Sequence, residues 1–341
     1  MNSYGLAYDR LSDEEKTIYI CILKGLLEYR QKIDLPKSSD KVDLLLLINT
    51  ILSDNPEIIY FNKTYITTVE TVFKKQIILS GCMNRSMIIK MNKELNDSIT
   101  DAIFEIKKSC KDCNDTWYLI KGIYEYIQRN VKYDKSEQAR LLRKGSNRPE
   151  LHNAYGPLVT GYGVCDGIAS AFTIIAKRLG IRSMVVTGKA GEGNEIEDHG
   201  WNIVEFEKRF YHLDLTWDVN KYWSQGEYSY EYFGLDDEEI SYDHSWVPRL
   251  TPRCNGNVLS YYLRNGLYAN SKYNLERIID DNIRRGEKVI RLQLSRDIVL
   301  PKDSGKYVSS IFMSIALRYK SQVKITYSWN EANRTFTVKL M

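Results

Sequence analysis

Three residue types that together perform nucleophilic chemistry follow one another in the middle of this chain of 341 residues. Cys165 lies in GYGVCDGIASAF, His199 in HGWNIV and Asp214 in YHLDLTWD. A thiol, an imidazole that takes its proton and a carboxylate that orients the imidazole are the parts of an activated cysteine nucleophile. A chain with 6 Cys and 4 His contains such combinations by chance. The prediction therefore depends on the local structure around each residue.

The sequence around Cys165 predicts the start of a buried helix. Gly161 and Gly163 are expected to end any helix or strand that precedes the cysteine. Apolar residues then recur at helical spacing until Gly180, namely Ile168, Ala169, Phe172, Ile175, Ala176 and Leu179. At a helix N-terminus, unpaired N–H groups and the positive end of the helix dipole favour the thiolate, which is the attacking form. The alternative is that Cys165 is a small buried hydrophobic residue, the commonest role of a free cysteine.

Strand parity relates His199 to Asp214. HGWNIVEF and FYHLDLTW both alternate, and the polar residues between them predict a β-hairpin. With a two-residue loop at 207–208, His199 lies opposite Thr216, and Asp214 lies one diagonal step away on the same face. Diagonal neighbours are about 7–8 Å apart, which the two side chains can bridge. We expect Asp214 to accept a hydrogen bond from one ring nitrogen, so that the other nitrogen faces the sulfur.

These motifs resemble the transglutaminase-like superfamily, whose core is similar to that of papain-like cysteine proteases. The resemblance covers residues 117 to 250 and includes IYEYIQRNVKYD, NAYGPLVTGYGVCDG, DHGWNIV and YHLDLTWD. YEYFGLDDEEISYDHSW resembles the ending of many bacterial members. The resemblance implies an α+β core in which a helix bearing the cysteine packs on an antiparallel sheet bearing His and Asp. It also implies that Cys165 is the nucleophile, His199 the base and Asp214 the orienting acid.

The tetrahedral intermediate of acyl transfer needs hydrogen-bond donors aimed at its oxyanion. The backbone N–H of Cys165 is one expected donor. Tyr155, in HNAYGPL, lies where members of this group often have a tyrosine, and its phenol is our candidate for the second donor. With 25 Tyr in the chain, a packing role for Tyr155 is the alternative.

Two functions of different classes fit these residues. In the first, the protein transfers the acyl group of a protein or peptide amide through a thioester at Cys165. The acceptor is water in a peptidase or amidase and an amine in a transglutaminase, and we favour hydrolysis. In the second, the protein is a catalytically silent transglutaminase-like binding or scaffold protein.

Several other residues offer alternatives for metal or redox chemistry. Cys165, His199 and Asp214 could instead be three zinc ligands with an open fourth position. Cys110 and Cys113 form a single CKDC, and without a second CxxC or a nearby His we interpret the pair as structural or incidental. Nothing in the sequence requires a cofactor or a metal.

The three remaining histidines and one loop have weaker interpretations. We interpret His152 and His212 as surface or hairpin residues, with a supporting role open for His212 because it shares a strand face with Asp214. His244 has no partner that the sequence identifies. GKAGEGNEIEDHG, residues 188–200, is either a mobile flap beside the site or a long exposed connection.

Composition limits the classes of partner. The chain is 43% hydrophobic and 27% charged, as in an ordinary globular protein, and its net charge is only +4. No basic block predicts nucleic-acid binding. The N-terminal residues lack a secretion signal, and VDLLLLINTIL is too short to cross a bilayer. We therefore expect a cytoplasmic protein with reduced cysteines that binds neither nucleic acid nor membrane.

We expect three α+β domains. They are an N-terminal domain at residues 1–112, the transglutaminase-like catalytic core that the resemblance implies at 113–250, and a C-terminal domain at 251–341. In the first, Ser12 and Glu15 form the capping box of a helix over 11–33. A helix over 39–52, strands within 56–81 and a helix over 84–110 follow. In the third, we expect a helix over 274–285, a strand over 288–295, a helix over 306–319 and a hairpin over 322–340. This last domain either contacts a partner or substrate, or protects one face of the catalytic core.

Overall fold

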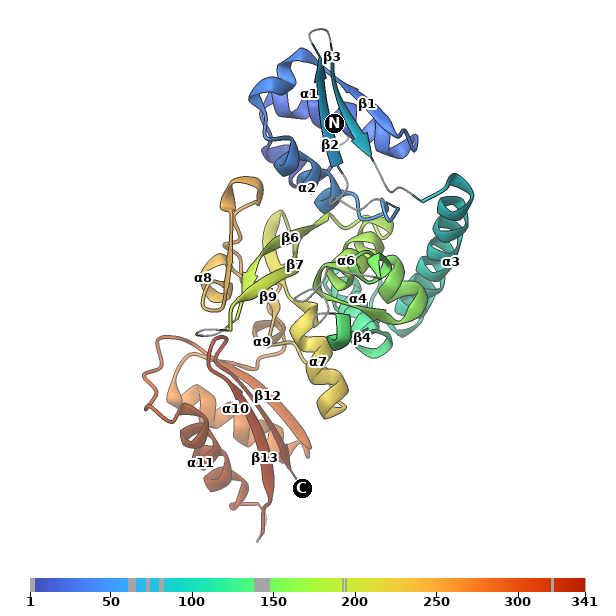
Figure 1. Ribbon diagram of the computed structural model, residues 1–341. Helices are drawn as coiled ribbons and strands as arrows, with labels where there is room; N and C mark the ends of the chain where they lie inside the picture. The colour runs from blue at the N-terminus through green and yellow to red at the C-terminus, as the bar shows by residue number, and fades with distance from the viewer. Residues whose placement is uncertain are drawn as a thin grey trace.

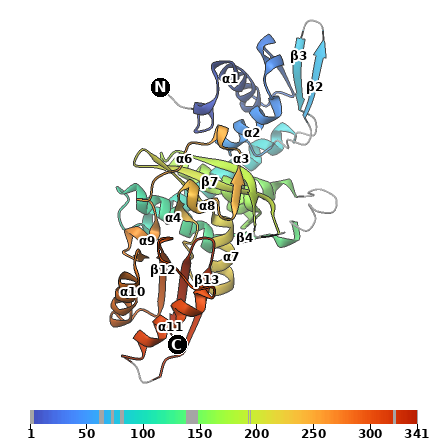
Figure 2. The ribbon, with the colours of Figure 1, turned by 90° about the vertical axis from the view of Figure 1, so that its left-hand side faces the viewer.

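The computed structural model describes residues 4–60, 66–71, 74–79, 83–137, 148–191, 193, 195–319 and 322–340. Three units follow one another along the long axis of the molecule, with the N-terminal unit at one end and the C-terminal unit at the other (Figures 1 and 2). Each unit combines helices with a sheet, so the predicted α+β class is confirmed. Among the described residues, every helix is too short or too polar to cross a bilayer.

The N-terminal unit packs two helices on a small antiparallel sheet. It contains α1 (Asp13–Leu27), β1 (Lys32–Leu35), α2 (Leu44–Asp54), β2 (Ile66–Thr71) and β3 (Lys74–Leu79). The strand order in the sheet is β1-β3-β2, and short helical turns lie at Tyr8–Arg10 and Lys37–Lys41. Ser12 and Glu15 cap α1 reciprocally, which confirms the predicted capping box. The helix ends earlier than the predicted residue 33 because Tyr29 has a φ of 58°, and β1 follows. Residues 61–65, 72–73 and 80–82 of the predicted strand region lie outside the described residues.

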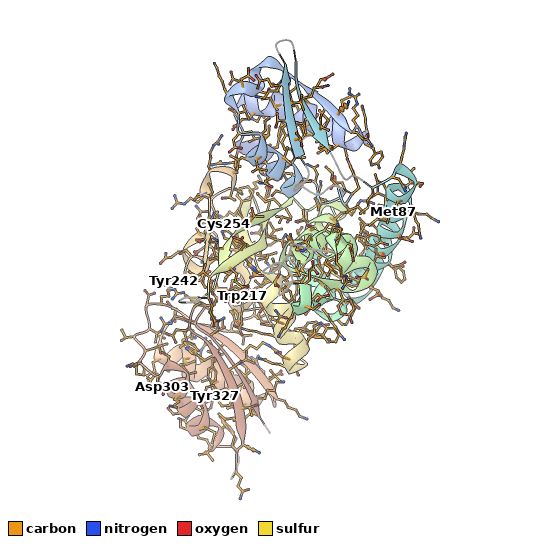
Figure 3. All side chains as sticks on the ribbon, in the orientation of Figure 1. Met87, Trp217, Tyr242, Cys254, Asp303 and Tyr327 are labelled. Carbon is orange, nitrogen blue, oxygen red and sulfur yellow. The ribbon has the colours of Figure 1, made fainter. Side chains whose placement is uncertain are left out.

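The long helix α3 (Arg85–Ser109) belongs with the central unit by its packing. Its buried residues Leu95, Ile99 and Ile106 join the same apolar cluster as Trp117 and the cysteine helix. Its opposite face is exposed, as Met87 shows (Figure 3). The apolar stripe of α3 is thus covered by the central core. The domain boundary at residue 112 stays a prediction.

The central unit has a five-stranded antiparallel sheet in the order β10-β6-β7-β8-β9. Its strands are β6 (Ser183–Ala190), β7 (Glu197–Phe206), β8 (Arg209–Leu213), β9 (Phe233–Leu235) and β10 (His244–Trp246). Its helices are α4 (Thr116–Asn130), α6 (Cys165–Arg178), α7 (Leu215–Gln225) and α8 (Asp237–Ile240). Shorter elements are β4 (Lys132–Tyr133), Pro149–His152, Gly156–Thr160, β5 (Tyr162–Gly163) and Pro248–Leu250.

Helix α6 packs against β6 and β7. Ile168, Phe172 and Ile175, on the predicted apolar face, are fully buried. Buried Asn202 of β7 joins sheet and helix, since its side-chain amide donates to the carbonyl of Ala169 at 2.8 Å and to the Thr173 hydroxyl at 2.9 Å. The cysteine helix is thus held against the strand that carries His199.

The C-terminal unit places two helices on one face of a four-stranded sheet. It contains α9 (Tyr261–Arg264), β11 (Tyr268–Ala269), α10 (Lys272–Arg284), β12 (Val289–Leu294), α11 (Ser304–Ala316), β13 (Ile325–Asn330) and β14 (Thr335–Leu340), in the sheet order β11-β12-β14-β13. The predicted helix, strand, helix and hairpin are confirmed, and the short β11 is additional. Arg291 pairs with Glu227 of the central unit at 3.2 Å, and Lys339 donates to the carbonyl of Gln225 at 2.7 Å. These contacts favour the packing role.

Candidate active site

Cys165 is the first residue of α6, as its sequence context predicts. The N–H groups of the first helical turn have no carbonyl four residues earlier within the helix, so they and the helix dipole stabilise negative charge there. The approach of β7 to this turn depends on Gly200, where a Cβ would lie only 3.1 Å from the Cα of Asp166. Because His199 is the neighbour of Gly200, this close approach brings the imidazole to the sulfur.

His199 extends from β7, where it pairs with Gly188 of β6. Its side chain is only 9% exposed, and Trp201 stacks near its ring at a centroid distance of 6.1 Å. Its Nε2 lies 2.8 Å from Oδ2 of Asp214, which leaves Nδ1 for the sulfur. Burial opposes protonation, but the charge and hydrogen bond of Asp214, with a contribution from Cys165, raise the pKa of His199 to about 9.

Asp214 lies between β8 and α7 and is fully buried. Its Oδ1 accepts a hydrogen bond from the backbone N–H of Thr216 at 2.9 Å and so caps α7. Its Oδ2 accepts from His199 and, at 3.1 Å, from Nε2 of His244. Burial disfavours the charge, but the cationic imidazole of His199 and the hydrogen bonds from both histidines outweigh it. The pKa of Asp214 is therefore well below its ordinary value.

The hairpin register follows the prediction as far as the strands extend. Phe206 pairs with Arg209, and Asn202 pairs with Leu213. The expected pairing of His199 with Thr216 is wrong, because β8 ends at Leu213 and the chain turns into α7. Asp214 still reaches His199, but from a helix cap rather than from a diagonal strand position.

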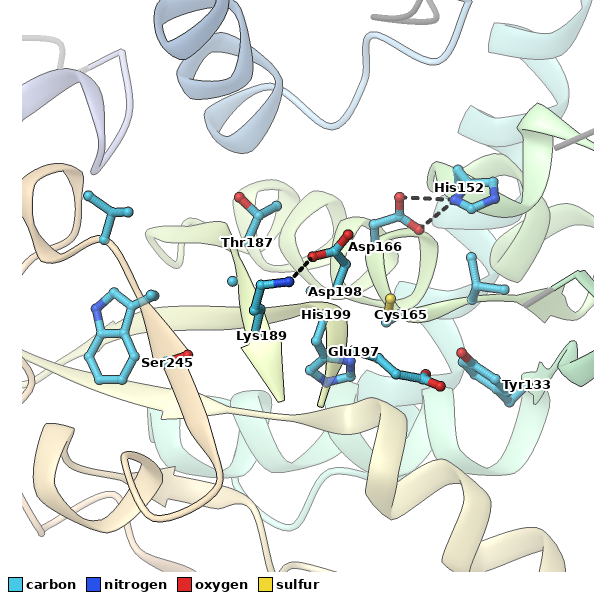
Figure 4. Close-up of a pocket in the computed structure, with 15 residues that line it drawn as sticks. Tyr133, His152, Cys165, Asp166, Thr187, Lys189, Glu197, Asp198, His199 and Ser245 are labelled. Atoms are coloured by element: carbon cyan, nitrogen blue, oxygen red, sulfur yellow. Dashed lines mark hydrogen bonds and ion pairs between the residues drawn. The ribbon is translucent and has the colours of Figure 1, made fainter. Parts of the chain in front are cut away.

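A cavity of about 630 Å³ contains the candidate nucleophile. Cys165, Glu197, His199 and Tyr133 gather in it (Figure 4). His152 also lines it, partly exposed and with its Nδ1 3.0 Å from Asp166, so it belongs to the cavity, which its interpretation as a surface or hairpin residue did not include. The segment 188–200, interpreted from the sequence as a flap or an exposed connection, consists of the ends of β6 and β7 and the connection between them. Residues 192 and 194 of this connection lie outside the described residues.

The two tyrosines near the cysteine helix have different positions. Tyr155, the predicted oxyanion donor, does not line the cavity, and its hydroxyl donates to Glu94 of α3 at 2.6 Å. This hydrogen bond and burial raise the pKa of Tyr155 to about 12. Tyr133 lies in the cavity instead. Burial and the neighbouring Cys165 raise its pKa, so its phenol stays protonated and able to donate.

His244 is the main residue that the sequence reasoning missed. It lies on β10, at the far edge of the sheet from β8, and bonds Asp214 through Nε2 and Asp243 through Nδ1. The one available signal was its place in the ending YDHSW, which is part of the family resemblance. His212, by contrast, accepts from Nε1 of Trp201 at 3.0 Å and faces Asp237 with Nε2.

In two clusters the potential metal-ligating atoms lie close enough together to hold a metal ion, but hydrogen bonds explain the arrangement of both clusters. In His212, Asp237 and Cys254, the Trp201 N–H points at Nδ1, so Nε2 carries the proton and cannot bind an ion. In His199, Asp214 and His244, both imidazoles bond the same carboxylate oxygen. The zinc alternative with Cys165 is not supported either, because among the described residues Cys165 belongs to no group of three or more residues whose potential ligand atoms all lie within 4.8 Å of one another.

Cys110 and Cys113 follow α3, away from the cavity. Burial and the neighbouring Cys113 raise the pKa of Cys110 to about 11. Among the described residues, no histidine joins this pair in a cluster that could hold a metal ion.

Comparison with known proteins gives one family match. Residues 105–215 match the sequence model of the Transglutaminase-like superfamily. No curated protein matches the chain. Among solved structures, a TGase is 15% identical, with a TM-score of 0.32, and the match covers 44% of this chain and 43% of that one.

Two further solved structures are similar over less than half of this chain. A candidate cysteine protease from Cytophaga hutchinsonii is 13% identical, with a TM-score of 0.28 and 44% and 61% of the two chains covered. A candidate protease from Parabacteroides distasonis is 14% identical, with a TM-score of 0.26 and 43% and 35% covered. The chain thus spans less than two thirds of each of these proteins. The matched segment contains Cys165, His199 and Asp214, and the chain carries a domain of the transglutaminase-like superfamily at residues 105–215.

Proposed function

We propose that this protein is a thiol-dependent acyl-transfer enzyme that acts on the amide of a protein or peptide. One observation carries the proposal. His199 lies between Cys165 and Asp214, with Nε2 held 2.8 Å from the carboxylate and Nδ1 left for the sulfur, at one wall of a cavity. This is the order of groups that converts a thiol into a nucleophile with a general base.

The chemical steps follow from this order. Nδ1 of His199 takes the thiol proton, and the Cys165 thiolate attacks the amide carbonyl carbon to form a tetrahedral intermediate. The C–N bond breaks as Nδ1–H donates its proton to the leaving amine, which leaves a thioester on Cys165. An acceptor then loses a proton to His199 and attacks the thioester carbon. The C–S bond breaks, which releases the acylated acceptor, and His199 returns the proton to the Cys165 sulfur. Asp214 holds the ring in place and stabilises its cationic form throughout.

Two donors are suited to the oxyanion of the intermediate. The first is the backbone N–H of Cys165 at the start of α6. The second is the phenol of Tyr133, which replaces Tyr155 in the proposal because it lies in the same cavity as the thiol. Two donors from separate elements are a common arrangement for stabilising such a charge.

Water is the proposed acceptor. The rim of the cavity contains exposed charged side chains, including Lys189, Glu197 and Asp198, so solvent reaches the space in front of Cys165. Amine transfer is the alternative, since the same thioester reacts with either nucleophile. Mass spectrometry of the products, with and without an added primary amine, separates the two acceptors.

The test is the pH dependence of alkylation at Cys165 by iodoacetamide, read by peptide mass spectrometry. We expect fast labelling well below the ordinary thiol pKa of about 8.5, because the positive His199 stabilises the thiolate. In His199→Ala, labelling at pH 6 should slow at least about tenfold. Labelling that is slow and insensitive to His199 would contradict the proposal and favour the silent binding protein.

Three of the other five cysteines provide internal controls in the same digest. Burial raises the pKa of Cys21 and of Cys254, and burial with Cys113 raises that of Cys110. These thiols should stay largely protonated and unlabelled at pH 6. Fast labelling that persists in Cys165→Ala would place the reactive thiol elsewhere.

A further inference from the structure

One carboxylate oxygen of Asp214 accepts hydrogen bonds from two histidines. Its Oδ2 lies 2.8 Å from Nε2 of His199 and 3.1 Å from Nε2 of His244, while its Oδ1 caps α7. All of these groups are buried or nearly so. The charge that Asp214 offers to His199 is therefore shared with a second imidazole that has no contact with the cavity.

The partners of His244 require it to be a cation. Its Nε2 faces Asp214, and its Nδ1 lies 2.5 Å from Oδ1 of Asp243. An ionised carboxylate can only accept hydrogen bonds, so both ring nitrogens carry protons. Burial opposes this charge, but the hydrogen bonds and charges of Asp214 and Asp243 outweigh it and raise the pKa of His244 to about 9.

The other elements around His244 bring few further charges. From β7 it meets His199 at a ring distance of 5.5 Å, and Trp201. From β8, His212 is near, and burial lowers the pKa of His212, so it is neutral. From α7 and the segment before β9 come Trp217 and Tyr232, whose hydroxyl donates to Asp243 at 2.7 Å. On its own strand the neighbours are Ser245 and Trp246, and on β6 it pairs with Ala190.

We infer that His244 is a positioning residue for the Cys165–His199 pair: it fixes the Asp214 carboxylate and partly neutralises it, so that the thiolate of Cys165 forms at lower pH. Without this cation, the net charge of the buried groups behind His199 becomes more negative and opposes an added negative charge on the sulfur. An opposite charge a few ångströms away shifts the pKa of a group by one to three units. Because His244 lies behind the His199 ring as seen from the sulfur, we expect a shift of about one unit in the pH at which the Cys165 thiolate forms. The inference rests on the proposed function.

The test is the acid limb of the alkylation profile of Cys165 in His244→Gln. Glutamine can donate one hydrogen bond to Asp214 but carries no charge. We expect the midpoint of the acid limb to rise by about one pH unit. His212→Gln is the matched control, because it also removes a buried imidazole from this sheet but removes no charge, and its midpoint should stay at the wild-type value.

Asp243→Asn provides a second variant if His244→Gln does not fold. It removes the negative charge of Asp243 and leaves His244 paired with Asp214, so the net charge behind His199 becomes less negative and the midpoint should fall instead of rise. An unchanged midpoint in a folded His244→Gln, with a clear effect of His199→Ala, would overturn the inference and leave the proposed function intact. A wild-type thiol of ordinary reactivity would instead overturn the proposed function. Stoichiometric bound metal whose removal by EDTA changes the wild-type profile would also overturn the inference, because His244 would then be a ligand.

Discussion

Two tyrosines, Tyr133 and Tyr155, show how the backbone around a residue decides its chemical environment. Tyr133 lies on β4, which pairs in parallel with β5 just before Cys165, so its side chain enters the cavity. Tyr155 precedes the helical turn Gly156–Thr160 and turns its hydroxyl to Glu94 on α3. The sequence motif predicted a tyrosine near the cysteine. Which of the two tyrosines enters the cavity depends on the pairing of β4 with β5, and a strand of two residues is too short to be predicted from the sequence.

Tyr133→Phe should slow the acylation of Cys165 without lowering the reactivity of its thiol toward alkylation. Acylation of Cys165 by an activated ester such as p-nitrophenyl acetate passes through an oxyanion, whereas alkylation by iodoacetamide does not. Loss of one oxyanion donor should lower the acylation rate by about a hundredfold. The alkylation rate should change less than about threefold, since the Cys165–His199 pair is intact. Both rates are measured on the same preparation.

Tyr155→Phe is the matched control, because it removes the same hydroxyl from a position that faces Glu94. Neither rate should change in this variant. Equal losses of acylation in the two variants, or a loss of alkylation in Tyr133→Phe, would refute the role of Tyr133 as oxyanion donor.

At the scale of elements, the β7–β8 hairpin shows how far sequence reasoning reaches. Alternation and a two-residue loop were enough to predict its register, and the loop residues Glu207 and Lys208 have φ values of 50° and 61°, as a type I′ turn requires. The end of β8 was not predicted. LDLTWD continues the alternation, but Asp214 caps α7, and cap formation depends on a helix whose Val219 and Leu215 are buried by the central core.

His244 could not be predicted for a related reason. Its contact with Asp214 needs β10 to pair with β6, on the opposite side of the sheet from β8. Local patterns specify hairpins, whereas this strand order depends on how distant segments cover the same core. The cysteine helix, by contrast, was predictable because its apolar face and its first residue are both local features.

Asp218 on α7 makes the stability of the central unit depend on pH. Its buried carboxyl accepts hydrogen bonds from the Tyr124 hydroxyl at 2.6 Å and from the N–H of Tyr232 at 3.2 Å. Burial nevertheless dominates and raises the pKa of Asp218 from 3.8 to about 7. The folded state therefore binds a proton that the unfolded state has already released, and this contribution to stability is lost as pH rises from about 4 to about 7.

We expect Asp218→Asn to gain stability relative to wild type over that interval, because asparagine does not titrate. As pH rises, the free energy of unfolding of the variant minus that of wild type should increase by about 1 kcal/mol per pH unit, and it should level off above pH 7. Urea unfolding at pH 5, 6, 7 and 8 measures it. Asp97→Asn, at an exposed position of α3, should show no such trend. A constant offset between Asp218→Asn and wild type across this range would show that Asp218 does not titrate there.

At the scale of the whole molecule, the C-terminal unit contacts the central unit through the turn between β13 and β14. Asn330 donates to Glu231 at 2.7 Å and to the Tyr232 hydroxyl at 3.3 Å. Tyr232 in turn donates to Asp243, which bonds His244. A series of hydrogen bonds thus joins the C-terminal hairpin to Asp214. The alternative role in binding a partner or substrate receives no comparable support, since the described lining of the cavity contains no residue beyond Val247.

Asn333 in the same turn tests how strongly the two units depend on each other. Its buried side-chain amide donates to the carbonyl of Glu231 at 3.0 Å, and the backbone carbonyl of Asn333 accepts from the side chain of Gln293 at 3.2 Å. Asn333→Ala leaves the buried Glu231 carbonyl without this donor, which should lower the free energy of unfolding by about 1–3 kcal/mol. Asn265→Ala removes an exposed asparagine that bonds only a carbonyl of its own helix, and should cost less than about 0.5 kcal/mol. If the C-terminal unit were merely tethered, the central unit would keep its wild-type stability in both variants. Protection of Cys254 from alkylation during urea unfolding measures this stability, because Cys254 is buried in one apolar cluster with Trp201 of β7.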